Sequence, residues 1–256
     1  MECITAVING KECDGEKGEF LLDIADRNGI VIPRLCHHES LRGLASCRLC
    51  LAEVTENNRK RIVTSCIFPV MRNITAETDT EEIRDMRGII IGFLMAEAPG
   101  NERISALAAE YGASDISRYR TDDGNACIVC GLCVRACAEV KPGCIGTTRR
   151  GVYKKIAPPF DEPPAGCVGC AACANVCPTG HIHMEETGGS RTIWGKEFEM
   201  IRCDVCGRFF MTKEQYDFIS KKTGAERPVC DACGRKAVAE KWVENRKYVY
   251  DRRPHI

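Results

Sequence analysis

Nineteen of the 256 residues are cysteines, and sixteen of them fall into four groups with the spacing of metal ligands. The groups are Cys36, Cys47, Cys50 and Cys66; Cys127, Cys130, Cys133 and Cys137; Cys167, Cys170, Cys173 and Cys177; and Cys203, Cys206, Cys230 and Cys233. Iron–sulfur clusters are held by cysteine thiolates at such intervals. The cysteines therefore predict a chain that binds several metal centres and moves electrons.

The two central groups form an internal repeat offset by forty positions, here called the first run (127–137) and the second run (167–177). In two-cluster ferredoxins the fourth cysteine of each run ligates the other cluster. Small residues in the runs, such as Gly131 and Gly169, let backbone N–H groups approach a cluster. We expect these cysteines to bind two 4Fe–4S clusters. The alternatives, that they bind zinc or are structural cysteines, are less favoured. The ligand sets would be Cys127, Cys130, Cys133 and Cys177 for one, and Cys137, Cys167, Cys170 and Cys173 for the other.

The composition argues against several other classes of protein. Cysteine makes up about 7% of the residues, less than in small disulfide-built secreted domains. The first ten residues lack the pattern of a signal peptide, and the longest apolar run, near 89–96, is too short for a membrane span. Lys plus Arg (36) balance Asp plus Glu (36), which gives no net field toward nucleic acid or an anionic membrane. We expect a cytoplasmic protein whose thiols are metal ligands.

The N-terminal group lies in a segment that predicts a strand over 3–9, a hairpin turn at Asn9-Gly10, a second strand from about Lys11 and a helix near 21–25. The stretches IPRLC (32–36), SCRLCLAEV (46–54) and TSCIFPV (64–70) resemble the plant-type 2Fe–2S module of the complex I large iron–sulfur subunit. The small iron–sulfur subunit of NAD-linked hydrogenase diaphorases carries a similar module. The resemblance implies a β-grasp domain whose 2Fe–2S cluster is bound by Cys36, Cys47, Cys50 and Cys66. A zinc site, or a Rieske centre using His37 and His38, is the alternative.

Two helices are predicted to connect the N-terminal domain to the first run. Thr78 and Glu81 fit a capping box for a helix to Glu97, whose apolar stripe would be Ile83, Met86, Ile90, Phe93 and Leu94. A second helix would begin after Asn101 and end at Gly112, with Ile104, Leu107, Ala108 and Tyr111 on one face. In the complex I subunit this region carries a further 4Fe–4S cluster with one histidine and three cysteine ligands. Residues 67–126 contain neither residue type, so that cluster is predicted to be absent.

The C-terminal group is a pair of CxxCG turns that would make a tetrahedral four-thiolate site from Cys203, Cys206, Cys230 and Cys233. Zinc is favoured there over a single iron ion or a 4Fe–4S cluster. Thr212 and Gln215 predict a capped helix to about Lys222, and a last helix is expected from about Arg235. Between the runs, residues 148–155 are predicted to form a basic hairpin, and residues 157–166 are predicted to form a proline-rich loop. Cys3, Cys13 and Cys144 lie outside the four groups.

These patterns together predict an α+β protein of four parts. They are a 2Fe–2S β-grasp domain (1–79), a helical connector (80–120), a two-cluster 4Fe–4S ferredoxin domain (121–186) and a zinc-ribbon-like module (187–256). The expected cofactors are one 2Fe–2S cluster, two 4Fe–4S clusters and one zinc or iron ion.

The chain shows no glycine-rich nucleotide-binding loop, so nicotinamide and flavin are expected on a partner. The resemblance implies an NADH-dehydrogenase-like flavoprotein (FMN) partner, a thioredoxin-like 2Fe–2S partner and room for a further catalytic subunit. It implies an electron-transfer subunit of an NAD(P)H-linked complex of hydrogenase, formate dehydrogenase, transhydrogenase or electron-bifurcating type. The alternatives are a free-standing multi-cluster ferredoxin and, with little clustered positive charge to favour it, a zinc-ribbon binder of nucleic acid.

Overall fold

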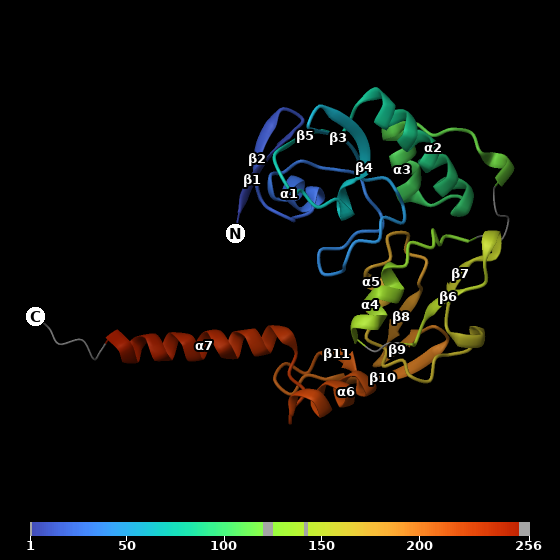
Figure 1. Ribbon diagram of the computed structural model, residues 1–256. Coiled ribbons are helices and arrows are strands. Elements are labelled where there is room, and N and C mark those ends of the chain that lie inside the picture. Colours follow the sequence, from blue (N-terminus) through green and yellow to red (C-terminus); the bar gives the residue numbers. More distant parts are fainter. Residues whose placement is uncertain (1, 120–124, 141–142, 251–256) are drawn as a thin grey trace, which may run out of the picture. The chain divides into compact units, whose positions relative to one another are not determined.

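Alternating apolar residues in the first eighty positions build a five-stranded sheet in the computed structural model of the chain (Figure 1). Its strands are β1 (Cys3–Ile8), β2 (Lys11–Glu16), β3 (Leu51–Glu56), β4 (Arg59–Thr64) and β5 (Ile74–Glu77). The order is β2-β1-β5-β3-β4, with β1 and β5 parallel and the other neighbours antiparallel. This mixed sheet fits the β-grasp topology that the resemblance implied.

The hairpin between β1 and β2 and the helix that follows it form as predicted. Asn9 and Gly10 both have positive φ, 49° and 77°, as a tight two-residue hairpin turn requires. Helix α1 (Leu21–Arg27) buries Leu21, Leu22, Ile24 and Ala25. They pack in one core with apolar residues of β1, β3 and β5, such as Ala6, Val54 and Ala76. Burial of this apolar surface is what stabilises the domain.

The structure describes residues 2–119, 125–140 and 143–250, and the chain divides into two units. The first unit comprises Met1–Asp161 and Ala172–Ile182, and the second comprises Glu162–Ala171 and His183–Ile256. The predicted boundary at 120/121 lies outside the described residues. Within the described ranges, no helix has the length and apolar character needed to cross a membrane.

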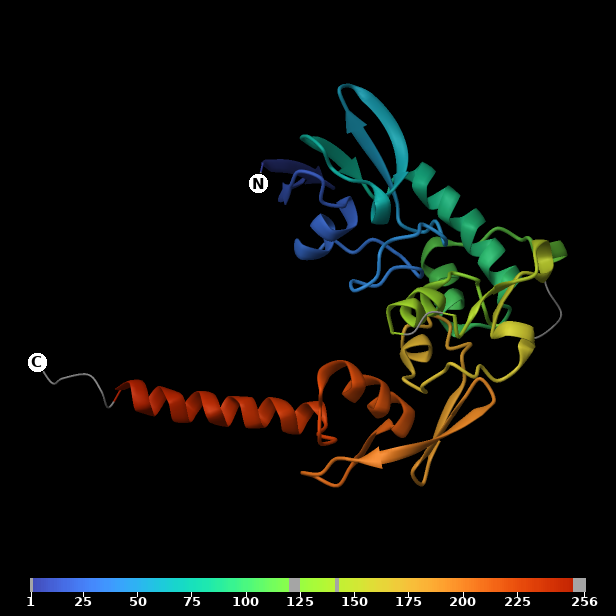
Figure 2. The same ribbon diagram turned by 60° about the horizontal axis from the view of Figure 1, so that its bottom comes forward.

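The helical connector consists of α2 (Glu81–Glu97) and α3 (Glu102–Tyr111), which lie side by side (Figures 1 and 2). Helix α3 agrees with the prediction: Asn101 Oδ1 accepts the Ile104 N–H at 3.3 Å, and Gly112 follows the last turn with a φ of 78°. The predicted start of α2 was wrong. Thr80 caps the helix by accepting the Ile83 N–H at 3.3 Å, while Thr78 pairs with Asn9 of the β1–β2 turn.

The predicted apolar stripe of α2 was only partly right: Ile83 is buried, and Ile90 and Leu94 are half-buried against the core. The buried positions are Ile83, Arg87, Gly88, Ile91, Gly92 and Ala96, whereas Met86 and Phe93 are exposed. The prediction passed over Arg87 because a fully buried arginine is rare. It is 1% exposed and occupies the middle of the buried face.

The rest of the first unit surrounds the first run. Helix α4 (Leu132–Val140) contains Cys133 and Cys137 and packs against α5 (Ala172–Asn175), the equivalent helix of the second run. Strands β6 (Gly146–Thr148) and β7 (Lys155–Ala157) pair antiparallel and confirm the basic hairpin. Short 3-10 turns occur at Ser65–Ile67, Ser117–Tyr119, Gly151–Tyr153 and Pro159–Asp161.

The second unit is built on a four-stranded antiparallel sheet in the order β11-β10-β9-β8. Its strands are β8 (Met184–Thr187), β9 (Ser190–Ile193), β10 (Lys196–Arg202) and β11 (Phe209–Thr212). Helix α6 (Lys213–Thr223) has the predicted cap, since Thr212 Oγ1 accepts the Gln215 N–H at 3.2 Å. Helix α7 (Asp231–Tyr250) begins four residues earlier than predicted, directly after Cys230, and continues as a single long helix (Figure 2).

Two glycines of α2 provide a matched test of packing in the connector. An alanine Cβ at Gly92 would collide with the Ser114 carbonyl oxygen and would lie 2.7 Å from Ile116 Cγ1. At Gly88 the nearest atom would be 3.7 Å away, so the added methyl group fits. We expect Gly92→Ala to destabilise the first unit by about 1–3 kcal/mol through overpacking. Gly88→Ala should be neutral, or stabilising by up to about 1 kcal/mol through helix propensity.

Urea unfolding of the anaerobically purified variants would measure both effects as shifts in midpoint. Equal midpoints for the two variants would contradict the packing described around Gly92.

Candidate metal centres

The four N-terminal cysteines converge on one buried site in the first unit. Cys36 and Cys47 lie in the long loop between α1 and β3, Cys50 directly precedes β3, and Cys66 follows β4. None of the four is more than 5% exposed. Ala45 and Arg48 adopt positive φ values of 53° and 58°, an uncommon conformation that lets successive N–H groups turn toward one side of the loop.

The thiols of this site approach one another in two pairs. The Cys36 thiol hydrogen-bonds Cys47, which lowers the pKa of Cys47 to about 6 and raises that of Cys36. In the same way the Cys66 thiol lowers the pKa of Cys50 to about 7, and its own pKa is raised. Backbone groups also face the sulfurs: the Cys47 N–H lies 3.4 Å from Cys36 Sγ, and the Leu35 N–H lies 3.5 Å from Cys47 Sγ.

This donor set fits a 2Fe–2S cluster, in which four cysteine thiolates serve two irons. Two pairs of thiols, each suited to one iron, match that division. Hydrogen bonds from N–H groups to the sulfurs stabilise the negative charge of the thiolates. His37 and His38 are not needed as ligands, because the four cysteines suffice.

The first three cysteines of the first run and Cys177 line one cavity of the first unit. Its lining contains the sulfur residues Cys127, Cys130, Cys133 and Cys177 but not Cys137. The remaining residues of the lining are largely apolar and include Ile128, Ile156, Pro178 and Ile182. The last cysteine of the second run thus lines the same cavity as the first three of the first run. Their binding of one cluster stays a prediction.

The surroundings of this cavity disfavour four thiolates unless a cation balances them. Burial raises the pKa of Cys130 to about 11 and that of Cys133 to about 12, and it raises the pKa of Cys127 as well. Burial would also raise the pKa of Cys177, but the Ile182 N–H and the Thr179 hydroxyl lower it overall. Metal binding overrides these preferences because a coordinating thiol is deprotonated.

The backbone repeats its conformation where the two runs begin. Val129 and Gly169 are equivalent positions, and both have positive φ, 47° and 67°. Each turns its N–H toward the preceding cysteine, at 3.3 Å from Cys127 Sγ and 3.4 Å from Cys167 Sγ. A left-handed conformation is unfavourable for a β-branched residue, so Val129 has strain that the ligand loop must offset.

The second predicted 4Fe–4S set stays a prediction. Cys137 and Cys173 belong to the first unit, and Cys167 and Cys170 belong to the second. In the second unit, the segment around Cys167 is held against the sheet. Arg191 donates to the Gly169 carbonyl at 2.6 Å, and the Thr212 hydroxyl donates to the Val168 carbonyl at 2.5 Å.

The four C-terminal cysteines gather around one point. Their Sγ atoms all lie within 4.8 Å of one another, and those of Cys206 and Cys230 are 3.8 Å apart. A tetrahedral ion with metal–sulfur bonds of about 2.3 Å separates its ligands by about 3.8 Å. Because the sulfurs surround one small point, the donor set fits a single ion such as zinc.

Local hydrogen bonds stabilise the thiolate forms of Cys203 and Cys230, which are the forms that bind a metal. The Cys230 N–H lies 3.3 Å from Cys203 Sγ and lowers the pKa of Cys203 to about 6. The Cys233 N–H lowers the pKa of Cys230, while hydrogen bonding to Cys230 raises the pKa of Cys233 to about 12. Each CxxC turn is closed by its glycine: the Gly207 N–H bonds the Cys203 carbonyl at 2.8 Å, and the Gly234 N–H bonds the Cys230 carbonyl at 2.9 Å.

The N-terminal site and the first run share one hydrophobic core, which the sequence did not reveal. Cys36, Cys47 and Leu49 pack in the same cluster as Cys130 and Leu132, together with Ile91 and Ile104 of the connector helices. The charge on Cys47 also acts on Cys130, although burial has the larger effect on the pKa of Cys130. The two candidate centres are therefore neighbours within the first unit.

Arginines beside the ligand loops were also missed. Arg135, between Cys133 and Cys137 on α4, donates to the Cys36 carbonyl at 2.9 Å and to the Arg42 carbonyl. Arg87 donates to carbonyls on both sides of Cys50. Both are charged residues on otherwise apolar helix faces, which is the signal that could have identified them.

Comparisons with known proteins agree with the N-terminal site. Residues 2–81 match the family described as the 2Fe-2S iron-sulfur cluster binding domain. The chain is 29% identical over 218 residues to the NADP-reducing hydrogenase subunit HndD of Solidesulfovibrio fructosivorans, a match of 73% of this chain and 37% of that protein. It is 31% identical over 180 residues to the NADH-ubiquinone oxidoreductase 75 kDa subunit of Reclinomonas americana, covering 60% of this chain and 26% of the relative.

Two further relatives extend the comparison. The NADPH-Fe(3+) oxidoreductase subunit alpha of Geobacter sulfurreducens is 30% identical over 253 residues, covering 89% of this chain and 29% of the relative. A crystal structure of NAD+-reducing [NiFe]-hydrogenase in the H2-reduced state shares the fold, with a TM-score of 0.60, 24% identity and coverage of 70% of this chain and 86% of that one.

These matches confirm the suspected resemblance to iron–sulfur subunits of hydrogenases and of complex I. The chain contains a 2Fe–2S domain and carries further iron–sulfur or metal-binding cysteines in an α+β fold. It spans less than two fifths of the length of the curated relatives named above.

The C-terminal quartet leads to a prediction about metal content. Replacing Cys230 with serine should lower the zinc content from about one ion per chain to near zero, because a structural zinc site needs all four ligands. Helix α7 begins at the next residue, so its helical circular dichroism should weaken as well. Elemental mass spectrometry of the purified protein would measure the loss and would distinguish zinc from iron.

Cys3→Ser is the matched control, because Cys3 is exposed at the start of β1 and belongs to none of the four groups. A Cys230→Ser protein that retained a full complement of the ion would contradict a four-thiolate site.

Proposed function

We propose that this chain is the electron-transfer iron–sulfur subunit of a cytoplasmic, multi-subunit NAD(P)H-linked oxidoreductase. The observation that carries the proposal is the shared core of the first unit, where ligand thiols of the 2Fe–2S domain and of the first run pack together. Two centres in one core could exchange electrons without a diffusing carrier. The named relatives are NADP-, NADH- and NADPH-linked oxidoreductase subunits, which supports the same reaction class.

The proposed cofactors are one 2Fe–2S cluster, two 4Fe–4S clusters and one zinc ion. Iron–sulfur clusters accept and release single electrons over a wide range of reduction potentials. The ligand sets are those predicted from the sequence: Cys36, Cys47, Cys50 and Cys66; Cys127, Cys130, Cys133 and Cys177; Cys137, Cys167, Cys170 and Cys173; and Cys203, Cys206, Cys230 and Cys233. The C-terminal quartet has a structural role in this proposal, because it is suited to a single ion.

The protein's own residues exclude water and orient the ligands. Apolar side chains such as Ile128 and Ile156 line the cavity of the first run. N–H groups of Cys47 and Val129 donate to ligand sulfurs, which stabilises negative charge and tunes the potential. Burial and hydrogen bonding to the sulfurs are the means by which a protein sets such potentials.

The proposed partners supply the chemistry that this chain lacks. An NADH-dehydrogenase-like flavoprotein with FMN would exchange hydride with the nicotinamide and pass single electrons onward. A thioredoxin-like 2Fe–2S subunit and a further catalytic subunit would complete the complex. Helix α7, with Val238, Trp242 and Val243 exposed, offers a surface through which the second unit could contact such a partner.

The experiment that tests the function is purification from the native host without oxygen, followed by addition of NADH or NADPH. We expect a flavoprotein to co-purify, and the iron–sulfur absorbance to bleach when the nicotinamide is added. Once this chain is separated from its partners, we expect it to hold roughly ten irons and one zinc, from the cluster types proposed. A lone chain that no flavoprotein accompanies would instead support a free-standing ferredoxin.

The proposed role of Cys177 as a cluster ligand gives a separate prediction. Cys177→Ser should remove roughly four irons per chain, because the serine hydroxyl replaces a thiolate of the 4Fe–4S cluster on the other run. Iron and acid-labile sulfide analysis would measure the loss, and the EPR signal of the 2Fe–2S centre should persist.

Cys144→Ser is the control, since Cys144 is buried but lies outside the proposed ligand sets. If Cys177→Ser kept all its iron while Cys144→Ser lost four, the proposed set would be wrong.

A further inference from the structure

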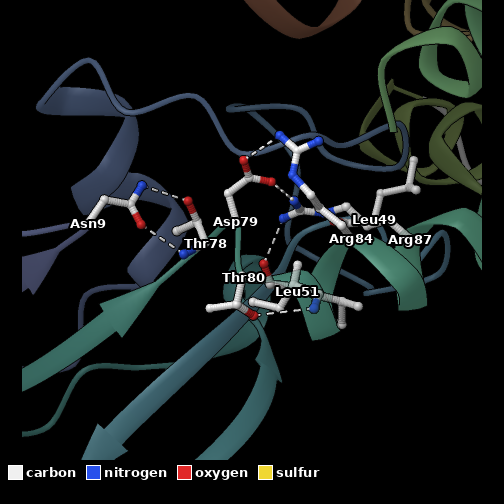
Figure 3. Close-up of polar contacts among 9 residues, drawn as sticks. Asn9, Leu49, Leu51, Thr78, Asp79, Thr80, Arg84 and Arg87 are labelled. Carbon is white, nitrogen blue, oxygen red and sulfur yellow. Dashed lines mark hydrogen bonds and ion pairs between the residues drawn. The ribbon is translucent and has the colours of Figure 1, made fainter. Parts of the chain in front are cut away.

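Arg87 of α2 is a fully buried cation beside the ligand loop of the 2Fe–2S domain (Figure 3). Its Nε donates to the Leu49 carbonyl at 3.0 Å, and its Nη2 donates to the Leu51 carbonyl at 2.9 Å. These two residues flank Cys50, a proposed cluster ligand. The guanidinium therefore hydrogen-bonds the backbone on both sides of one proposed ligand.

These hydrogen bonds fix the direction of the ligand peptide. In a trans peptide the C=O and the following N–H point in opposite directions. Because the Leu49 carbonyl faces Arg87, the N–H of Cys50 faces away from the guanidinium. Arg87 thus orients the peptide that joins Leu49 to Cys50. The carbonyl of this peptide points toward the guanidinium, and its N–H points to the opposite side of the loop.

The positive charge of Arg87 is only partly balanced. Among the described residues, its carboxylate partner is Asp79, at 3.4 Å from Nη1, and that side chain is 45% exposed. Arg84 competes for the same carboxylate at 2.6 Å (Figure 3). The Tyr111 ring lies 5.2 Å from the guanidinium carbon and offers a weaker cation–π contact. Arginine does not lose its proton in proteins, so an incompletely neutralised charge remains inside the domain.

Neighbouring groups keep Asp79 in place. Thr78 exchanges two hydrogen bonds of 2.8 Å with the Asn9 side chain, and Thr80 caps α2 (Figure 3). Asp79 stands between these two anchored residues. Its distance from Arg87 is therefore set by the fold and not by a flexible loop.

We propose that Arg87 is a positioning residue that raises the reduction potential of the 2Fe–2S centre, and that Asp79 limits how far it does so. The inference rests on the proposed binding of this cluster by Cys36, Cys47, Cys50 and Cys66. Reduction adds one electron, and hence one negative charge, to the centre. A fixed positive charge in a low-dielectric interior stabilises the reduced form more than the oxidised form.

The test is an EPR-monitored titration of the purified holoprotein with sodium dithionite, with redox mediators present. In Arg87→Gln the cation is lost, so we expect the ratio of reduced to oxidised centre at a fixed potential to fall about tenfold, which is about 59 mV for one electron. In Asp79→Asn the cation is less balanced, and the ratio should rise. Arg87→Lys keeps the charge and should lie closer to the wild type than Arg87→Gln does.

Arg84→Gln is the matched control. Arg84 binds the same carboxylate, but its side chain is 48% exposed, so its charge is screened and its loss should shift the potential little. Asp79→Asn changes a half-exposed residue and keeps the proposal testable should Arg87→Gln fail to fold.

Opposite shifts for Arg87→Gln and Asp79→Asn support the inference. Unchanged potentials in both, or an equal shift in Arg84→Gln, overturn it. A wild-type protein that shows no 2Fe–2S signal would instead remove the proposed function on which the inference rests.

Discussion

Thiolates held a few ångströms apart repel one another. Much of the structure around the ligand cysteines offsets that repulsion. Burial raises the pKa of Cys130 to about 11 and that of Cys133 to about 12, so both thiols favour the neutral form unless a cation binds. Hydrogen bonds lower the pKa of Cys47 and Cys203 to about 6. A metal bound by deprotonated thiols relieves the repulsion and adds its binding free energy to folding. This stabilisation adds to that supplied by the two apolar cores of the first unit.

The need to stabilise negative charge on the ligand sulfurs also accounts for the positive φ values in the ligand loops and for the arginines beside them. Ala45, Arg48 and Val129 adopt positive φ in the ligand loops, where their conformations cost free energy but turn N–H groups toward sulfur. Two arginines, Arg87 and Arg135, donate to carbonyls of the N-terminal ligand loop from α2 and α4. These carbonyl oxygens, beside Cys50 and on Cys36, are thus bound by cations. The connector and the first run are thereby joined to the loop that holds the 2Fe–2S ligands.

Local patterns in the sequence predicted local structure well. The Asn9-Gly10 turn, the helix between Asn101 and Gly112 and the cap at Thr212 all form, because each depends on a few adjacent residues. The cysteine spacing also identified the N-terminal and C-terminal quartets, whose thiols lie close together in the fold. The centre of the buried face of α2 could not be predicted, because it is Arg87, whose partners are carbonyls distant in sequence. The shared core of the two sites is likewise a tertiary feature, without a local signal.

The central claim is that two iron–sulfur centres of the first unit lie close enough to exchange electrons. The most direct test is EPR spin relaxation of the reduced 2Fe–2S centre, compared between the wild type and Cys133→Ser, which should lack the neighbouring cluster. Relaxation should be faster in the wild type, because a nearby paramagnetic cluster shortens the relaxation time. Identical relaxation in the two proteins, with the 2Fe–2S signal present in both, would contradict it.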